Sequence, residues 1–251
     1  MSPPPSLPQL VEDLRDLAAR HGAPAKDTTL TAASTAALFL GVDPATGGPL
    51  LRALAGSPDL AAGLLRIWGR WEQSFPYLHG NIGPLTRWLE HPAEHHLAAL
   101  RAQLTHLTHV DLLAIAEGPS VRGDLLGQIL TLIDAPGDRA VRGAFFTPPS
   151  LAGALSALAG VTDLPAGAVI TDPCVGGGGL VVAAVRAMRA AGTAPEARRW
   201  ILQDIDPFAV TIAGVAMSIH GIPWVELSCS DTLGTPHPRE KQFSQPELAI
   251  A

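Results

Sequence analysis

The chain has 251 residues, of which 47% are hydrophobic and 16% are charged, a balance that excludes a disordered or collagen-like protein. Its 17 Lys and Arg against 23 Asp and Glu give a net charge of −6, which disfavours nucleic-acid binding by this chain alone. The two cysteines exclude a disulfide framework and fit a cytoplasmic location, and no apolar run reaches the roughly 20 residues of a membrane span.

The first half of the chain has a helical pattern. Residues 1–8 are rich in proline, and we expect a disordered tail there. Over residues 9–136, apolar residues recur every three or four positions in stretches broken by Gly, Pro and Asp, which predicts a helical domain. The predicted helices cover residues 10–21, 31–40, 44–55, 58–73, 82–89, 92–105 and 124–133.

Residues 137–251 follow a different pattern, in which short apolar runs alternate with helices. Strands are predicted over 168–171, 200–203 and 224–229, with helices over 180–191 and 207–220 between them. This βαβαβ order implies an α/β fold with a parallel sheet, and we expect helices on both of its faces.

A glycine-rich loop follows the first predicted strand. Asp172 and Pro173 directly follow the strand, and glycines occupy positions 176–179 at the start of the helix. Glycine lets backbone approach a ligand closely, and a helix N-terminus offers free N–H groups, so the loop predicts a nucleotide-like cofactor. No Lys-Ser/Thr pair follows the glycines, which excludes a P-loop, and Asp172-Pro173 fits the dinucleotide pattern poorly. The alternative is a turn that binds nothing.

A second acid follows the second predicted strand, at Asp204. An acid at this position in such a sheet holds ribose hydroxyls, although a helix cap or a solvated turn is the alternative interpretation. Asp206 and Pro207 are typical of a cap and a first-turn proline of the next helix.

Five segments in chain order resemble motifs of the N6-adenine DNA methyltransferases, most closely the modification subunit of type I restriction systems. They are Asp124-Leu125-Leu126-Gly127-Gln128, Gly143-Ala144-Phe145-Phe146-Thr147-Pro148, the loop 172–180, Gln203-Asp204-Ile205-Asp206-Pro207 and Ser230-Asp231-Thr232-Leu233. Each segment is weak alone, but the combination is specific. The resemblance implies a class I, Rossmann-like fold that binds S-adenosyl-L-methionine (SAM).

The resemblance also implies a role for each matching residue. The methionine end of SAM would lie beside Phe146, Thr147, Pro148, Asp172 and the backbone of Gly176 and Gly178. Asp204 would hold the ribose, Ile205 would pack on the adenine, and Asp231 would bind the adenine amine. The chain departs from the family at Val175, Gly177 and Asp204, where the family has Cys, Ser and Glu.

The family's catalytic loop, Asn/Asp-Pro-Pro-Tyr/Phe, does not occur in the sequence, so we predict no catalytic residue in this chain. Residues 243–251 resemble the stretch that precedes this loop, with 248–251 as a fourth strand. We therefore expect the SAM-binding half of a split or truncated methyltransferase. A second polypeptide would supply the loop, the remaining strands and any DNA contact, unless the chain associates with itself through the open sheet edge.

Two other functions fit the sequence. The fold could serve small-molecule biosynthesis, as in antibiotic pathways, and act on an amine by an intramolecular ring closure of the aziridine type without consuming SAM. The chain could also be a non-catalytic scaffold.

His91 and His95 have the spacing of a metal pair, but a solvated helix face is favoured and no metal site is predicted. The aromatic residues between positions 68 and 88 are expected in the core or at an interface rather than stacked on bases.

Overall fold

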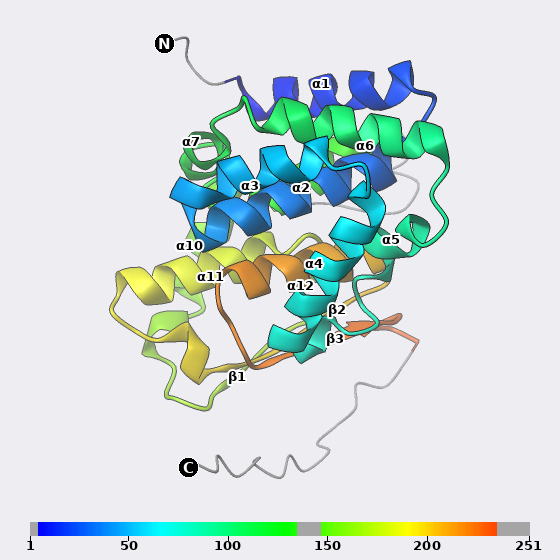
Figure 1. Ribbon diagram of the computed structural model, residues 1–251. Coiled ribbons are helices and arrows are strands. Elements are labelled where there is room, and N and C mark those ends of the chain that lie inside the picture. Colours follow the sequence, from blue (N-terminus) through cyan, green and yellow to red (C-terminus); the bar gives the residue numbers. More distant parts are fainter. Residues whose placement is uncertain (1–4, 135–146, 235–251) are drawn as a thin grey trace, which may run out of the picture.

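The computed structural model describes residues 5–134 and 147–234, and Figure 1 shows a helical layer above a small sheet. The first part contains α1 (Leu7–Arg20), α2 (Ala25–Val42), α3 (Pro44–Gly56), α4 (Leu60–Ser74), η1 (Pro76–Leu78), α5 (Gly83–Thr86), η2 (Arg87–Leu89), α6 (Glu94–Leu107), α7 (Leu112–Glu117) and α8 (Leu125–Ile133). All seven predicted helices are confirmed, although segment 82–89 is divided between α5 and η2.

Side chains that precede these helices explain where several of them begin. Ser6, Asp43, Asp111 and Asp124 each accept a hydrogen bond from a backbone N–H in the first turn of the helix that follows. Such caps satisfy donors that a helix cannot pair internally.

The second part has the predicted alternation. It contains α10 (Pro149–Leu158), η3 (Val161–Asp163), β1 (Val169–Asp172), α11 (Gly179–Ala190), η4 (Pro195–Ala197), β2 (Arg199–Asp204), α12 (Pro207–Ile219) and β3 (Val225–Cys229). The predicted strand over 248–251 lies outside the described residues.

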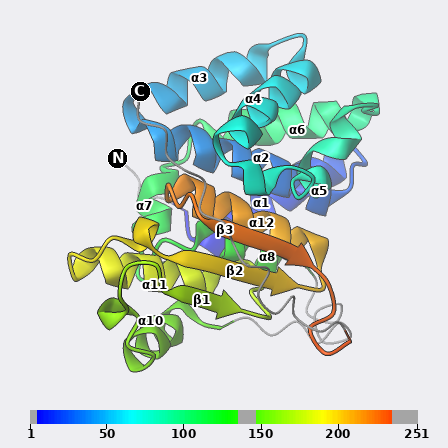
Figure 2. The same ribbon diagram turned by 90° about the horizontal axis from the view of Figure 1, so that it is seen from below.

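The three strands form one parallel sheet in the order β1-β2-β3, with Val169 opposite Arg199 and Trp200 opposite Val225. Both crossovers run in the same direction across the sheet, so right-handed connections place α11 and α12 on the same face (Figure 2). The expectation of helices on both faces is therefore wrong for the described residues, because strand order cannot be deduced from the alternation alone.

Helix α12 is buried on both sides, between the sheet and the helical layer. Every residue from Ala209 to Ser218 is buried. Ile212 and Val215 belong to the core of the helical layer, whereas Ala213 and Met217 pack with α11 and β2. A Cβ on Gly214 would lie 2.5 Å from the Leu227 side chain, so glycine permits the close contact with β3.

Aromatic side chains join the two layers. The Trp71 indole N–H donates to the Ser218 hydroxyl at 2.8 Å, and the Tyr77 hydroxyl donates to the Ile222 carbonyl at 3.0 Å. Trp68 is fully buried, and Phe75 and Trp88 pack against the same core. The aromatic group is thus part of the core, as predicted.

Among the described helices, none combines the length and apolar character needed to cross a bilayer.

One edge of the sheet is exposed in the described residues. Strand β1 ends the order β1-β2-β3 and has no strand on its outer side within the described ranges. Val169, which lies on the sheet face that α11 and α12 leave open, is 51% exposed. Helix α10 packs against α11 and lies beside this edge (Figure 2), with three exposed leucines spaced along one side, namely Leu151, Leu155 and Leu158. Apolar side chains at spacings of four and three residues form a continuous helix face.

Candidate cofactor-binding site

The loops that follow the three strands meet at the carboxyl edge of the sheet. The Val175 N–H donates to the Gln203 carbonyl at 2.8 Å, and the Ser230 N–H donates to the Asp204 carbonyl at 3.0 Å. The Thr232 hydroxyl also donates to the Pro173 carbonyl. The structure therefore brings the segments around Asp172, Asp204 and Asp231 to one edge, as expected for parallel strands.

Asp172 ends β1 and is half-buried. One carboxylate oxygen accepts a hydrogen bond from the Cys174 N–H at 3.1 Å. Burial raises the pKa of Asp172, the hydrogen bond from Cys174 opposes this, and the negative charge of Asp204 raises it further. A cationic ligand at this position would relieve the burial cost and the repulsion between the two carboxylates.

Asp204 ends β2 and holds the glycine loop. Its Oδ2 accepts from the Gly176 N–H at 2.8 Å, and its Oδ1 accepts from the Asp206 N–H at 2.9 Å. Each carboxylate oxygen can accept two hydrogen bonds, so ribose hydroxyls can still donate to this side chain. A Glu, as in the family, would place the carboxylate one methylene farther out.

Ile205 and Asp231 lie at the nucleoside end of the predicted site. Ile205 is 68% exposed, which leaves its side chain available to a planar ring. The Cys229 thiol lies 3.6 Å from the Ile205 carbonyl. Asp231 is exposed, and its carboxylate accepts from the Leu233 N–H at 2.9 Å within its own loop.

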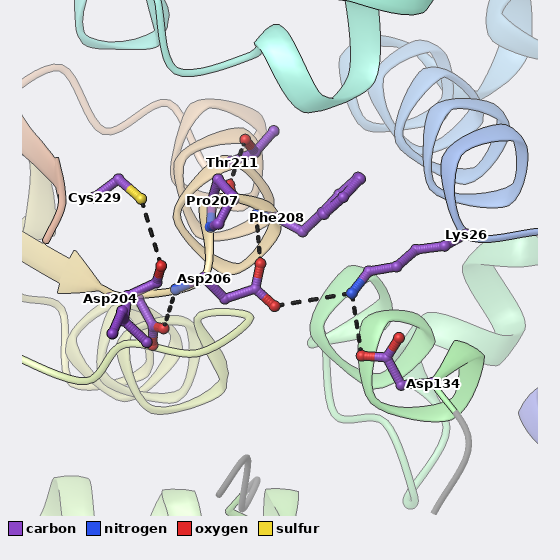
Figure 3. A network of polar contacts seen from close by, with 9 residues as sticks. Lys26, Asp134, Asp204, Asp206, Pro207, Phe208, Thr211 and Cys229 are labelled. Atoms are coloured by element: carbon purple, nitrogen blue, oxygen red, sulfur yellow. Dashed lines mark hydrogen bonds and ion pairs between the residues drawn. The ribbon is translucent and has the colours of Figure 1, made fainter. Parts of the chain in front are cut away.

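A network from the helical layer fixes the start of α12 (Figure 3). The Asp206 carboxylate caps α12 by accepting from the Phe208 N–H at 2.8 Å. Lys26, at the start of α2, lies 3.8 Å from Asp206 and 3.1 Å from Asp134, and its ammonium lies 4.8 Å from the centre of the Phe208 ring. Lys26 thereby ties α2, α8 and α12 together directly beside the Asp204-Ile205 segment.

The methionine end of the predicted site includes a contribution from α8. A small cavity of about 40 Å³ is lined by Thr147, Cys174 and the glycine loop together with Asp124 and Gln128. The sequence placed Asp124 and Gln128 in a motif but gave them no role. Pro148 is exposed at the N-terminus of α10, and Phe146 lies outside the described residues.

Three of the four glycines in the loop are required for different structural reasons. Gly176 and Gly178 have φ values of 53° and 93°, a region that favours glycine. Gly177 has no such φ, but a Cβ there would lie 2.5 Å from the Cα of Gly127 on α8. The Ser that the family has at this position would not fit, because the contact is between two backbones.

The residues at this edge fit a SAM molecule. In the described residues the backbone N–H groups of Gly177 and Gly179 donate no hydrogen bond, so they remain available at the start of α11. Half-buried carboxylates at Asp172 and Asp204 suit an ammonium and a ribose diol, and the exposed Ile205 suits an adenine. In the parts of the chain that the structure describes, no three His, Cys, Asp or Glu side chains form a metal site.

A parallel sheet with a glycine loop after its first strand and an acid after its second defines a partial Rossmann-like fold, as predicted. The comparison with solved structures agrees. The structure is similar to the methyltransferase subunit of a type I restriction-modification system from Streptococcus thermophilus, with a TM-score of 0.51 and 17% sequence identity. The match covers 94% of this chain and 60% of that one, so this chain spans only part of the length of the matched subunit.

The sequence identifies the family more closely. Residues 123–245, just under half of the chain, match the model of the family described as N-6 DNA Methylase, so this segment is N6-adenine DNA methyltransferase-like. The resemblance stated from the five motifs is thus confirmed. No protein with a curated description matches the sequence significantly.

Proposed function

We propose that this chain is the SAM-binding half of an N6-adenine-type methyltransferase. SAM would lie across the carboxyl edge of the sheet, with its methionine end at Thr147, Asp172 and the glycine loop. Asp204 would hold the ribose, and Ile205 and Asp231 would hold the adenine. When bound, SAM supplies the methyl group that is transferred to an exocyclic amine.

The observation that carries this proposal is the direct contact between the first two motifs of the sheet. The Gly176 N–H donates to the Asp204 carboxylate at 2.8 Å, so the glycine loop and the acid that ends β2 form one unit rather than two separate turns. A turn that binds nothing has no need for a half-buried carboxylate pair such as Asp172 and Asp204, because desolvation of charge is costly.

The exposed edge of the sheet supports a partner. Strand β1 has no neighbour on its outer side among the described residues, so further strands could pair with it and extend the sheet toward α10 (Figure 2), where Leu158 is 84% exposed. We infer that a second polypeptide with the Asn/Asp-Pro-Pro-Tyr/Phe loop completes the sheet here. DNA would then be contacted through that partner, since this chain carries a net charge of −6.

Calorimetric titration of SAM tests the cofactor assignment. We expect binding by the chain, strengthened by the partner, and loss of binding in Asp172→Ala. Asp16→Ala is a matched control, because Asp16 is an exposed carboxylate on α1 away from the sheet edge. Unchanged SAM affinity in Asp172→Ala would refute the site.

Size-exclusion chromatography with light scattering tests the partner surface. Leu158→Glu should leave the chain folded, because the side chain is exposed, and should abolish assembly with the partner. Leu50→Glu is the control, since Leu50 on α3 is 52% exposed but lies in the helical layer. Equal assembly by both variants would exclude α10 from the interface.

A further inference from the structure

Asp124 is a buried carboxylate to which the proposed function assigns no role. Its side chain caps α8, and the residue is 6% exposed. Oδ1 accepts from the Gly127 N–H at 3.2 Å and Oδ2 accepts from the Gln128 amide at 3.1 Å. Both donors are neutral, and no ion pair to Asp124 forms within the described residues.

The carboxylate lies against the glycine loop. A Cβ on Gly179, the first residue of α11, would be 2.8 Å from Oδ2 of Asp124. In the adjacent contact, Gly177 meets Gly127 backbone to backbone. The first turn of α8 and the start of α11 are therefore packed together with Asp124 between them, where the positive end of the α11 dipole favours a negative charge.

The same carboxylate reaches the methionine end of the proposed SAM site. Asp124 and Gln128 line the small cavity that also contains Thr147 and Cys174. At this end SAM carries an ammonium group and a sulfonium centre against a single carboxylate, so a bound cofactor would bring net positive charge close to Asp124.

The ionisation of Asp124 is set mainly by its burial. Burial raises its pKa to about 7, while the hydrogen bonds from Gln128 and Gly127 lower it. The other charged or titratable groups that share its surroundings are Glu117, Arg122, Cys174, Arg186, Arg189 and His220.

The positive charge that these neighbours provide near Asp124 changes little near neutral pH. Arg186 is paired with Glu117 by two hydrogen bonds of 2.9 and 2.6 Å, and Arg189 is paired with Glu196. Burial and two nearby arginines lower the pKa of His220 to about 4, so this side chain is neutral at pH 7. The arginines keep their charge throughout this range.

We propose that Asp124 is a positioning residue of the glycine loop and that it couples SAM binding to the release of a proton. This inference rests on the proposed function. Without ligand near neutral pH, part of the population holds a protonated Asp124. The positive charges of bound SAM favour the carboxylate, and the O–H bond of the acid breaks with transfer of its proton to solvent water. The charged carboxylate then holds the first turns of α8 and α11 against the loop.

Calorimetry at two pH values tests the coupling. In the wild type, SAM affinity should rise about five- to tenfold between about pH 6 and pH 8, as expected for a group whose charged form the ligand favours. Asp124→Asn should lack this rise in affinity. Titration of SAM itself and of Asp172 affects both proteins alike, so it cancels when their pH profiles are compared. Asp111→Asn, which changes the exposed cap of α7, is the matched control and should behave as the wild type. Identical pH profiles for the wild type and Asp124→Asn would overturn the coupling.

Hydrogen exchange distinguishes failure of this inference from failure of the proposed function. If no SAM binds at any pH, the proposed function is wrong, but the positioning role can still be measured. The Gly178 N–H, which donates to the Val175 carbonyl at 3.0 Å, should exchange several-fold faster in Asp124→Ala than in Asp111→Ala. Equal exchange rates in these two variants would overturn the positioning role.

Discussion

Replacement of Gly177 by alanine isolates the contact between α8 and the glycine loop. The new Cβ would lie 2.5 Å from the Cα of Gly127, so the two backbones must separate by about 1 Å to reach an ordinary contact. Gly177 does not have a positive φ, and the penalty therefore comes from crowding alone. Overpacking of this kind costs about 1–3 kcal/mol, and the lower entropy of the unfolded alanine chain offsets about 0.4–1 kcal/mol of it.

We expect a net loss of about 1–2 kcal/mol, or about 2–8 °C in melting temperature for a chain of this size, together with weaker SAM binding. Urea and thermal unfolding provide the measurement. Gly153→Ala is the control, because Gly153 lies inside α10 with no atom within 4 Å of a new Cβ, and alanine there should stabilise the helix. If Gly177→Ala is as stable as Gly153→Ala, the close contact between α8 and the loop is not present in solution.

Three further predictions concern charge and exposure. Because the folded state raises the pKa of Asp124 to about 7, it binds a proton more tightly than the unfolded chain, so stability falls as the pH rises from about 4 to 7. Asp124→Asn should remove that loss, so at pH 8 the variant should be more stable than the wild type by up to about 4 kcal/mol in urea unfolding. Equal stability of the two proteins at pH 8 would contradict the burial argument. Lys26→Met should lower the free energy of unfolding by about 1–3 kcal/mol, because the contacts to Asp134 and Asp206 are lost. The control, Arg15→Ala at an exposed side chain, should lower it by less than about 0.5 kcal/mol. Equal losses in the two variants would refute the special position of Lys26. Ile205→Ser should weaken SAM binding in calorimetry while unfolding changes by less than about 0.5 kcal/mol, because the side chain is 68% exposed; a large loss of stability would instead assign Ile205 to the core.

The sequence predicted most elements of the fold because their patterns are local. The alternation of strands and helices after residue 137 and the acids that end β1 and β2 are confirmed by the structure. Within residues 5–134 and 147–234, two α-helices were not predicted. α7 (Leu112–Glu117) is too short for a helical period to be recognised, and α10 carries leucines on an exposed side and Gly153 in its middle, so no single buried face is apparent.

The part of the site that could not be predicted depends on contacts between distant segments. Asp124 begins one of the five motifs, but its burial arises only when α8 packs against Gly177 and Gly179. The ion pairs of Lys26 likewise join three helices that are far apart along the chain. The binding roles of Asp172, Asp204, Ile205 and Asp231 remain predictions, whose geometry at one sheet edge now makes them testable.

The double burial of α12 has a consequence for how this chain melts. Since one side of the helix belongs to the helical layer and the other to the sheet, loss of either neighbour would expose an apolar flank to water. Unfolding should accordingly be one cooperative event across both layers. A ligand bound at the sheet edge would then delay melting around Trp68 as much as around Trp200, both of which are fully buried. Intrinsic tryptophan fluorescence can therefore report on candidate cofactors without any label near the site.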